Sequence, residues 1–285
     1  MVLAPTDQSV SDEQFEMIRE LVYRHCRIRL ADGKKDLVRT RMARCLRETG
    51  IRDVAAYLAH VTADRSGREF SRLIDAISTN LTSFFRERNH FHFIERQVLP
   101  ELLAAKRTAG SNRLRIWSAG CSTGEEPYSI AMTVLKALDP HAGWDVKILA
   151  SDISRRVLRI AKAASYEAAQ VKVVPEPFRS RFFGEGRRAC ERGFFVLPEA
   201  RNLVSFRYLN LAEAWPFNGP FDFIFCRNVM IYFDSETQQR LVNRCWDVLA
   251  PGGYLFTGHS ESLNGLEHRF QYAEPTVYQK PQVQG

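Results

Sequence analysis

A short apolar strand that runs into a glycine-rich turn and then into a helix is the clearest structural signal in the chain. Residues 114–119, Leu-Arg-Ile-Trp-Ser-Ala, have strand character. Gly120 and Gly124 follow, where a backbone can turn sharply and approach a ligand closely. Pro127 stands just inside the next helix, where its missing N–H is tolerated. This order predicts the first strand-turn-helix unit of an open α/β sheet.

Strands and helices alternate from residue 113 onward, which predicts a parallel, doubly wound sheet. Residues 166–202 interrupt the alternation with prolines and glycines around short apolar pieces, so we expect an inserted, partly β subdomain there. The last apolar stretch predicts an antiparallel hairpin at the sheet edge. The expected strands are 114–119, 146–151, 203–209, 221–226 and 253–258, the helices 125–138, 154–164 and 235–249, and the hairpin 270–279.

The N-terminal part of the chain has helical periodicity and no strand signal. Apolar residues recur at helical spacing around Phe15, Tyr57 and Phe70. The aromatic-rich stretch that follows is expected to continue as a helix and to link this part to the sheet. We therefore predict three regions: a helical bundle over residues 11–80, a linking helix over 81–112, and an α/β domain over 113–285.

Composition limits the class of protein. A chain of 285 residues with 45% hydrophobic content has enough apolar residues for a real core. No run reaches the roughly 18 apolar residues of a membrane span, and no signal-peptide pattern opens the chain. The six cysteines lack metal-like spacing, which is typical of reduced thiols. We expect a soluble, cytoplasmic protein without membrane insertion; its cysteines are Cys26, Cys45, Cys121, Cys190, Cys226 and Cys245.

The formal charge of +7 is concentrated near the N-terminus. Between Arg24 and Arg47 the chain has nine basic residues and only Asp32 and Asp36 as acids. Such a segment indicates either a docking surface for an acidic partner or a solvated helix face. A nucleic-acid-binding module is the third alternative, but aromatic interleaving and the known recognition signatures are missing. We expect no nucleic-acid partner.

Acidic residues stand where a phosphate-binding turn would have none. Glu125 and Glu126 follow Gly124 in the first turn of the helix, where they would repel a phosphate. Asp152 ends the second strand, where an acid typically accepts the two ribose hydroxyls. Together they predict an adenosine ligand that has a positive centre and no phosphates. S-adenosylmethionine (SAM) meets both conditions.

Two further polar clusters are candidates for the same site. Asn228 and Tyr232 follow the strand expected beside the first one, so they should lie at the same sheet edge; the alternative is a capping turn before the next helix. Thr82 and Arg86 lie in an apolar stretch. They are either a helix cap and a surface ion pair, or part of a segment over the cofactor, with Arg86 offering a forked cation to a carboxylate.

Five motifs together resemble a known family. They are Asn80-Leu-Thr-Ser-Phe-Phe-Arg-Glu, Trp117-Ser-Ala-Gly-Cys-Ser-Thr-Gly-Glu-Glu-Pro-Tyr-Ser, Ser151-Asp-Ile, Phe225-Cys-Arg-Asn-Val-Met-Ile-Tyr-Phe and Gly258-His-Ser-Glu. With these motifs the chain, from about residue 15 to 278, resembles the bacterial chemotaxis receptor glutamate O-methyltransferases, the CheR family. The resemblance implies a helical N-terminal domain, a SAM-binding Rossmann-like α/β domain and a small inserted β-subdomain.

The resemblance also implies an activity and a site. The activity is methyl transfer from SAM to glutamate side chains of chemoreceptors (methyl-accepting chemotaxis proteins), which yields glutamate methyl esters and S-adenosylhomocysteine (SAH) without a metal. Arg86 and Tyr232 would be nearest the transferred methyl. Matching positions imply that SAM is held by Asn80, Thr82, Arg86, Gly120, Glu126, Asp152, Asn210, Leu211, Arg227 and Asn228.

The partner implied by the resemblance is the cytoplasmic helical bundle of a receptor, which is an acidic rod. We expect the helix carrying Lys35, Arg39 and Arg44 to contact it, and the enzyme to act as a monomer. In some family members the β-subdomain also docks on a peptide at the receptor C-terminus. In this chain the corresponding loop, residues 184–193, keeps a G-x-G but is longer than the family leads us to expect.

The implied reaction also fits the chemistry of these residues when the resemblance is set aside. A glutamate nucleophile, with a pKa of about 4.3, is already ionised at neutral pH and needs no general base. The residues that follow the fourth strand are Arg227-Asn-Val-Met, not the Asn/Asp-Pro-Pro-aromatic pattern of many amino-group methyltransferases. This difference argues against a base-methylating enzyme.

A hydrolase and a metal site are the rival predictions. Residues 120–124 match G-x-S-x-G, and Ser122, Asp222 or Asp234, and His259 follow in α/β-hydrolase order. A nucleophile elbow follows several strands, however, whereas the chain before residue 113 is helical. His90 and His92 are two apart on an expected helix and would point to different faces, so we expect no metal.

Overall fold

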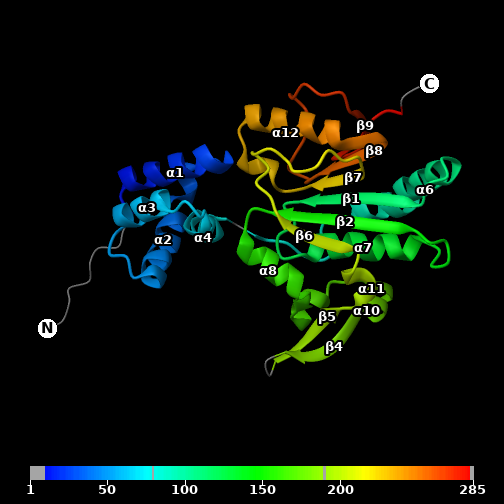
Figure 1. The fold of residues 1–285 in the computed structure, drawn as a ribbon, viewed down its shortest axis with the longest axis horizontal. Helices are drawn as coiled ribbons and strands as arrows, with labels where there is room; N and C mark the ends of the chain where they lie inside the picture. The colour runs from blue at the N-terminus through cyan, green and yellow to red at the C-terminus, as the bar shows by residue number, and fades with distance from the viewer. Residues whose placement is uncertain (1–9, 79, 189–190, 283–285) are drawn as a thin grey trace.

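The computed structural model describes residues 10–78, 80–188 and 191–282. A helical domain at the N-terminal end lies beside a larger α/β domain, and a small second sheet projects from the α/β domain (Figure 1). Among the described residues, no helix is both long and apolar enough to cross a bilayer. Cys190 and the tip of the 184–193 loop lie outside the described residues.

The N-terminal domain is a bundle of four helices with its own apolar core, as predicted. Ser11 and Gln14 form a capping box that starts the first helix. The core contains Phe15, Met42, Leu58 and Ile74, one from each helix. The helices are α1 (Asp12–Cys26), α2 (Lys35–Thr49), α3 (Val54–Ala63) and α4 (Arg68–Ile77), with a 3₁₀ turn at Asp32–Lys34.

The expected linking helix over 81–112 is wrong in its first seven residues. Described residues 80–87 form no helix, and the chain becomes helical only at α5 (Arg88–Phe93), which continues through a π-helical turn (Ile94–Val98) into α6 (Leu99–Thr108). Phe84 packs edge-on against Tyr166 and Phe183, whereas the Phe85 amide donates to Ser129 Oγ. Phe85 and Glu87 have left-handed backbones, with φ of 52° and 58°, which interrupt a right-handed helix and form a turn instead.

The α/β domain contains the predicted parallel sheet. Its strand order is β6-β2-β1-β7-β8-β10-β9, with β1 between β2 and β7 as expected. The first five strands in this order run parallel, and the predicted hairpin closes the edge antiparallel to β8. The strands are β1 (Arg113–Ala119), β2 (Asp145–Asp152), β6 (Val204–Tyr208), β7 (Phe221–Cys226), β8 (Leu249–Thr257), β9 (Gln271–Glu274) and β10 (Val277–Gln279).

Helices cover both faces of this sheet because its strands are apolar on both sides. Consecutive residues of β1, Ile116 and Trp117, point to opposite faces and belong to two different core clusters. The Ile116 side packs with α7 (Glu125–Ala137) and with α6, and the Trp117 side packs with α12 (Ser235–Val248). Helix α8 (Arg155–Ala163) follows β2, and its first residues lead away from the end that carries Asp152.

The inserted segment forms a three-stranded antiparallel sheet, as expected, in the order β3-β5-β4. Its elements are β3 (Ser165–Tyr166), α9 (Ala168–Val171), α10 (Glu176–Phe182), β4 (Phe183–Arg188), β5 (Glu191–Val196) and α11 (Pro198–Arg201). Docking of a receptor peptide on this sheet stays a prediction.

Candidate active site

The carboxyl end of β1 is shaped by close backbone contacts. The amides of Gly120 and Cys121 both donate to the Ser151 carbonyl, at 2.8 and 2.9 Å. Gly120 has φ +79°, and a Cβ there would lie 2.4 Å from Val229 Cγ2. Gly124 has φ +99°, and a Cβ there would lie 2.8 Å from the Tyr166 hydroxyl. Only glycine fits both places, so this turn brings its backbone against the neighbouring loop and helix.

A single cavity at this sheet edge brings the predicted site residues together. The helical domain contributes to its wall with Ile28, Lys34 and Ile77, so the two domains share the cavity. The predicted residues in its lining are Asn80, Thr82, Arg86, Gly120, Glu126, Asp152, Asn210, Leu211, Arg227, Asn228 and Tyr232. The cavity and the residues around it define the candidate active site.

Asp152 is a buried acid with part of its hydrogen-bonding capacity in use. Its Oδ2 accepts from the Ser122 amide at 2.9 Å and its Oδ1 from the Ser154 amide at 2.8 Å. Burial raises the pKa of Asp152 to about 6, although the two amides lower it in part. A carboxylate has about four acceptor positions, so it can still accept ligand hydroxyls.

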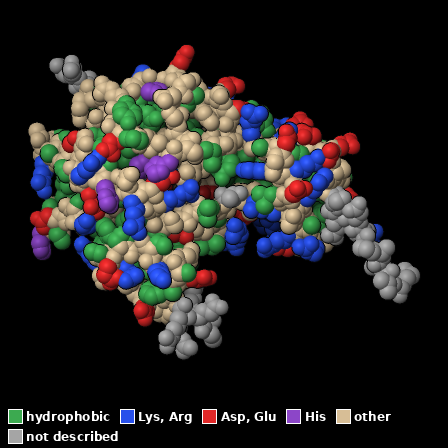
Figure 2. Space-filling view, turned by 180° about the vertical axis from the view of Figure 1, so that it is seen from behind, with side chains coloured by type: hydrophobic (Ala, Val, Ile, Leu, Met, Phe, Trp, Pro, Cys, Tyr) green, Lys and Arg blue, Asp and Glu red, His purple; other side chains and the backbone are tan. Residues whose placement is uncertain are grey.

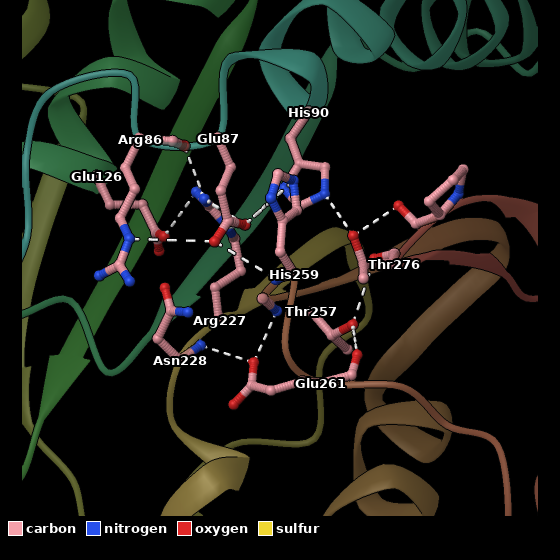
Figure 3. A network of polar contacts seen from close by, with 12 residues as sticks. Arg86, Glu87, His90, Glu126, Arg227, Asn228, Thr257, His259, Glu261 and Thr276 are labelled. Atoms are coloured by element: carbon pink, nitrogen blue, oxygen red, sulfur yellow. Dashed lines mark hydrogen bonds and ion pairs between the residues drawn. The ribbon is translucent and has the colours of Figure 1, made fainter.

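Glu126 and Glu87 hold Arg227 between them (Figure 3). The side chain of Arg227 is only 1% exposed, and its nitrogens lie 2.8 Å from Glu87 and 3.2 Å from Glu126. It also donates to the Arg86 carbonyl at 2.7 Å. Burial raises the pKa of Glu126, whereas Arg227 holds the pKa of Glu87 below its usual value against the effect of burial. This network ties the 80–87 segment to the start of α7 and the end of β7.

Glu261 fixes the loop that carries Tyr232. Its carboxylate is buried and accepts from the amides of Asn228 and Gly258, both at 2.6 Å, and from that of Ile231 at 3.2 Å. A Cβ on Gly258 would lie 2.5 Å from Asn228 Nδ2. Glu261 ends the Gly258-His-Ser-Glu motif, and its role was missed from sequence. The available signal was an acidic residue three positions after a glycine, and its partners are backbone amides that no sequence pattern displays.

Arg86 and Tyr232 lie at the part of the cavity that receives side chains from both domains. Arg86 Nη1 donates to the Leu81 carbonyl at 2.7 Å, and its guanidinium is about one-third exposed. Lys34 lies over the Tyr232 ring at 4.7 Å, and the Arg29 amide donates to the Tyr232 carbonyl at 2.7 Å. Burial raises the pKa of Tyr232. Lys34 was missed because charge counts do not show which way a lysine points.

Four non-glycine residues around the site have left-handed backbones. They are Phe85, Glu87, Ser122 and Asn228, with φ of 52°, 58°, 49° and 57°. Such angles are uncommon for residues with a Cβ and are retained where the surroundings determine them. The amide of Ser122 donates to Asp152 and that of Asn228 donates to Glu261, so these contacts maintain the turns.

Several charged residues have partners that the sequence pattern does not reveal, and docking of Lys35, Arg39 and Arg44 on a receptor stays a prediction. Glu125 does not face the cavity: it accepts from Thr123 Oγ1 at 2.6 Å and from Gln170 Nε2 at 3.1 Å, toward the inserted segment. Lys35 and Arg39 pair with Asp12, and Arg39 Nε donates to the Val10 carbonyl, so both hold α2 to the start of α1. Arg44 pairs with Glu48 and is exposed.

The hydrolase alternative finds no support in the geometry. Ser122 Oγ donates to the Asn80 carbonyl, Asp222 pairs with Lys106, and Asp234 caps α12. His259 lies instead beside Glu87. Ligand atoms of Glu87, His90 and His259 lie within 4.8 Å of one another, as a metal site would require. The Glu87 oxygen nearest to both histidines, however, already pairs with Arg227. Burial lowers the pKa of His90 to about 3.

A doubly wound sheet with an acid at the end of β2 and an acid in place of a phosphate site has the architecture of SAM-dependent methyltransferases. The family profile "CheR methyltransferase, SAM binding domain" matches residues 80–279, and "CheR methyltransferase, all-alpha domain" matches residues 13–78. The chain belongs to the CheR methyltransferase family. The profile boundary places the 81–112 segment with the α/β domain.

Relatives agree with this assignment. The chemotaxis protein methyltransferase of Escherichia coli is 42% identical over 95% of this chain and 91% of its own length. Chemotaxis protein methyltransferase 2 of Pseudomonas aeruginosa is 43% identical over 93% and 92%, and a probable chemotaxis protein methyltransferase of Rhizobium etli is 39% identical over 90% and 96%.

Proposed function

We propose that this protein transfers the methyl group of SAM to glutamate side chains of chemoreceptors, forming methyl esters and SAH. Membership of the CheR family supports the reaction class. The observation that carries the proposal is the cavity in which Asp152, Glu126, Arg86 and Tyr232 meet. We further propose that the enzyme acts as a cytoplasmic monomer.

The residues of the cavity fit SAM without phosphate-binding features. Asp152 would accept the ribose hydroxyls, because its carboxylate has free acceptor capacity at the end of β2. Asn210 and Leu211 would contact the adenosine, and Glu126, next to the buried Arg227, would contact the amino-acid portion. When bound, SAM supplies an activated methyl group on a sulfonium centre.

The protein's own task is alignment and exclusion of water. The acceptor glutamate is ionised at neutral pH, so no group of the enzyme has to remove a proton. Arg86 would hold the acceptor carboxylate with a forked guanidinium, and Tyr232 would border the path of transfer. Leu81, which is 79% exposed at the cavity, would cover the reacting groups once the receptor docks.

The helical domain would receive the receptor. A helix bundle carrying glutamates is an acidic rod, and the basic segment of residues 24–47 would attract it. All three members of the predicted trio are in surface ion pairs, but the Arg44 side chain is 74% exposed, against 28% for Lys35 and 36% for Arg39. Arg44 would therefore contribute most to docking.

A single experiment tests the reaction. The protein is incubated with methyl-labelled SAM and receptor cytoplasmic fragments, and label is sought as base-labile ester on glutamate. Fragments in which the candidate glutamates are replaced by alanine serve as the control. Label that resists base, or that persists on the alanine fragments, would rule out the proposed acceptor.

A further inference from the structure

A second cavity lies between the two domains, away from the candidate active site. It is bordered by α2, α3, α4 and the first turns of α8, and its volume is about 490 Å³. Cavities of roughly 300–1,000 Å³ hold small-molecule ligands. Lys and Arg side chains gather over the helical domain, on the right of Figure 2. We call this cavity the arginine groove.

The charge of the arginine groove is strongly positive. Five arginines line it against the carboxylates of Glu48 and Asp75; they are Arg41, Arg44, Arg72, Arg156 and Arg159. Arg44 pairs with Glu48 and Arg72 with Glu69. Within the described part of the chain, Arg156 and Arg159 on α8 have no hydrogen bond or ion pair of their own. Two guanidiniums one helical turn apart favour an anion with several oxygens and at least two charges.

A buried hydroxyl in the groove wall is a second, independent sign of a ligand. Tyr57 is 0% exposed and lines the groove, and among the described residues no nitrogen or oxygen forms a hydrogen bond with its hydroxyl, whose polar neighbour is the Cys45 thiol. The thiol of Cys45 beside it is only a weak hydrogen-bonding group. Leaving a buried hydroxyl unpaired is unfavourable, and an oxygen-rich ligand would satisfy it.

The groove is connected to the candidate active site through two short links. Asp75 accepts from Ser154 Oγ, and the Ser154 amide donates to Asp152, which lines the first cavity. Ser78 lines both cavities. An anion bound to Arg156 and Arg159 would act on Ser154, which caps the start of α8, and through it on the position of Asp152. Binding of the anion would then change the affinity of the candidate active site for its cofactor, because the two sites are thermodynamically linked.

We propose that the arginine groove binds a small phosphate-bearing anion and that its occupancy changes the affinity of the cofactor site. This goes beyond the proposed methyl transfer; only its second part rests on the proposed cofactor site. The charge of the groove favours phosphate over a single carboxylate, because one carboxylate would neutralise only one of the two unpaired arginines.

Pyrophosphate tests the binding directly. It is titrated into the full-length protein by calorimetry at constant ionic strength, up to about 10 mM. We expect saturable one-to-one binding that is about tenfold or more weaker in Arg156→Ala/Arg159→Ala, and about threefold weaker in Tyr57→Phe. The matched control is Arg107→Ala/Arg113→Ala, which removes the same charge from α6 and β1 and should bind normally.

Four results would overturn the proposal, three of them its first part and the last its second part. Absence of saturable binding, or equal weakening in the control, would mean that only general charge attraction acts. If pyrophosphate does not bind but Arg156→Ala/Arg159→Ala raises KM for receptor, the groove belongs to receptor docking. An unchanged SAH dissociation constant at saturating pyrophosphate would remove the link to the cofactor site. Normal methyl transfer by the wild type without pyrophosphate keeps these outcomes separate from failure of the proposed function.

Discussion

Asp152 makes cofactor binding sensitive to pH at the scale of one side chain. Because its pKa is raised to about 6, the free protein holds a proton there that the unfolded chain would release above about pH 4. The stability that this raised pKa adds to the folded state is therefore present below about pH 4 and is lost as pH rises toward about 6. Ribose hydroxyls bind the ionised form better, so the trend in affinity is the opposite.

We expect SAH to bind more tightly as pH rises through about 6, with a proton released on binding below that value. Calorimetry in buffers of different ionisation enthalpy would measure both effects. Asp152→Asn should flatten the pH dependence and weaken SAH binding by about 1–3 kcal/mol. A wild type whose affinity is constant between pH 5 and 7 would contradict the ribose assignment.

Arg86 should affect the transfer step more than cofactor binding. Its guanidinium is partly exposed at the cavity, whereas Arg227 is buried in the ion-pair network. Arg86→Ala and Arg86→Lys should lower kcat strongly and change the SAH dissociation constant little, because the fork is proposed to orient the acceptor. Tyr232→Phe is the companion variant. Normal kcat with weakened SAH binding in Arg86→Ala would place Arg86 on the cofactor alone.

At the scale of the element, Glu261 supports the loop between β7 and α12. Glu261→Gln leaves one acceptor oxygen for three amides, so we expect about 1–3 kcal/mol less stability and a lower kcat. Denaturant unfolding and steady-state kinetics measure the two effects. Glu267→Gln, an exposed change in the following loop, is the matched control. Equal behaviour of the two variants would show that the loop holds its shape without Glu261.

The outward face of α2 gives a prediction about docking. Arg44→Glu should raise KM for receptor and leave SAH binding unchanged, and the defect should shrink as salt screens charges beyond about 8–10 Å. Arg240→Glu on α12 removes an arginine from a similar exposed pair four residues apart and serves as the control. A normal KM at low salt for Arg44→Glu would mean that the receptor docks elsewhere.

Much of the element pattern could be predicted because the strands and helices from residue 113 onward have clear periodicity. The 80–87 turn could not, because Phe84 and Phe85 look like part of an apolar helix. Their placement depends on Tyr166, Phe183 and Ser129, which are distant in sequence. Similarly, Lys34 and Lys35 are adjacent, yet one lies over Tyr232 and the other pairs with Asp12.

At the scale of the whole molecule, the two domains share one cavity wall and several polar contacts. Asn210 Nδ2 donates to the His25 carbonyl, and the Tyr23 hydroxyl donates to Asp234. We expect SAH at a hundredfold excess over its dissociation constant to add about 2.7 kcal/mol to stability, or roughly 5–10 °C in Tm. Scanning calorimetry should show both domains melting together. Two transitions, of which SAH shifts only one, would contradict a shared cavity.

The left-handed residues around the site should make selection for stability and selection for activity favour different sequences. Phe85, Glu87, Ser122 and Asn228 each hold a conformation that glycine adopts with about 1 kcal/mol less strain. A mutant library selected only for heat resistance should therefore accumulate glycine at Ser122 and Asn228 and lose methyl transfer as these side chains disappear. Phe85 and Glu87 should stay, because glycine there would lose the buried ring contacts of Phe85 or leave the buried Arg227 without Glu87. A library selected for turnover should keep the strained residues and gain its stability elsewhere, in the helical domain and the outer strands.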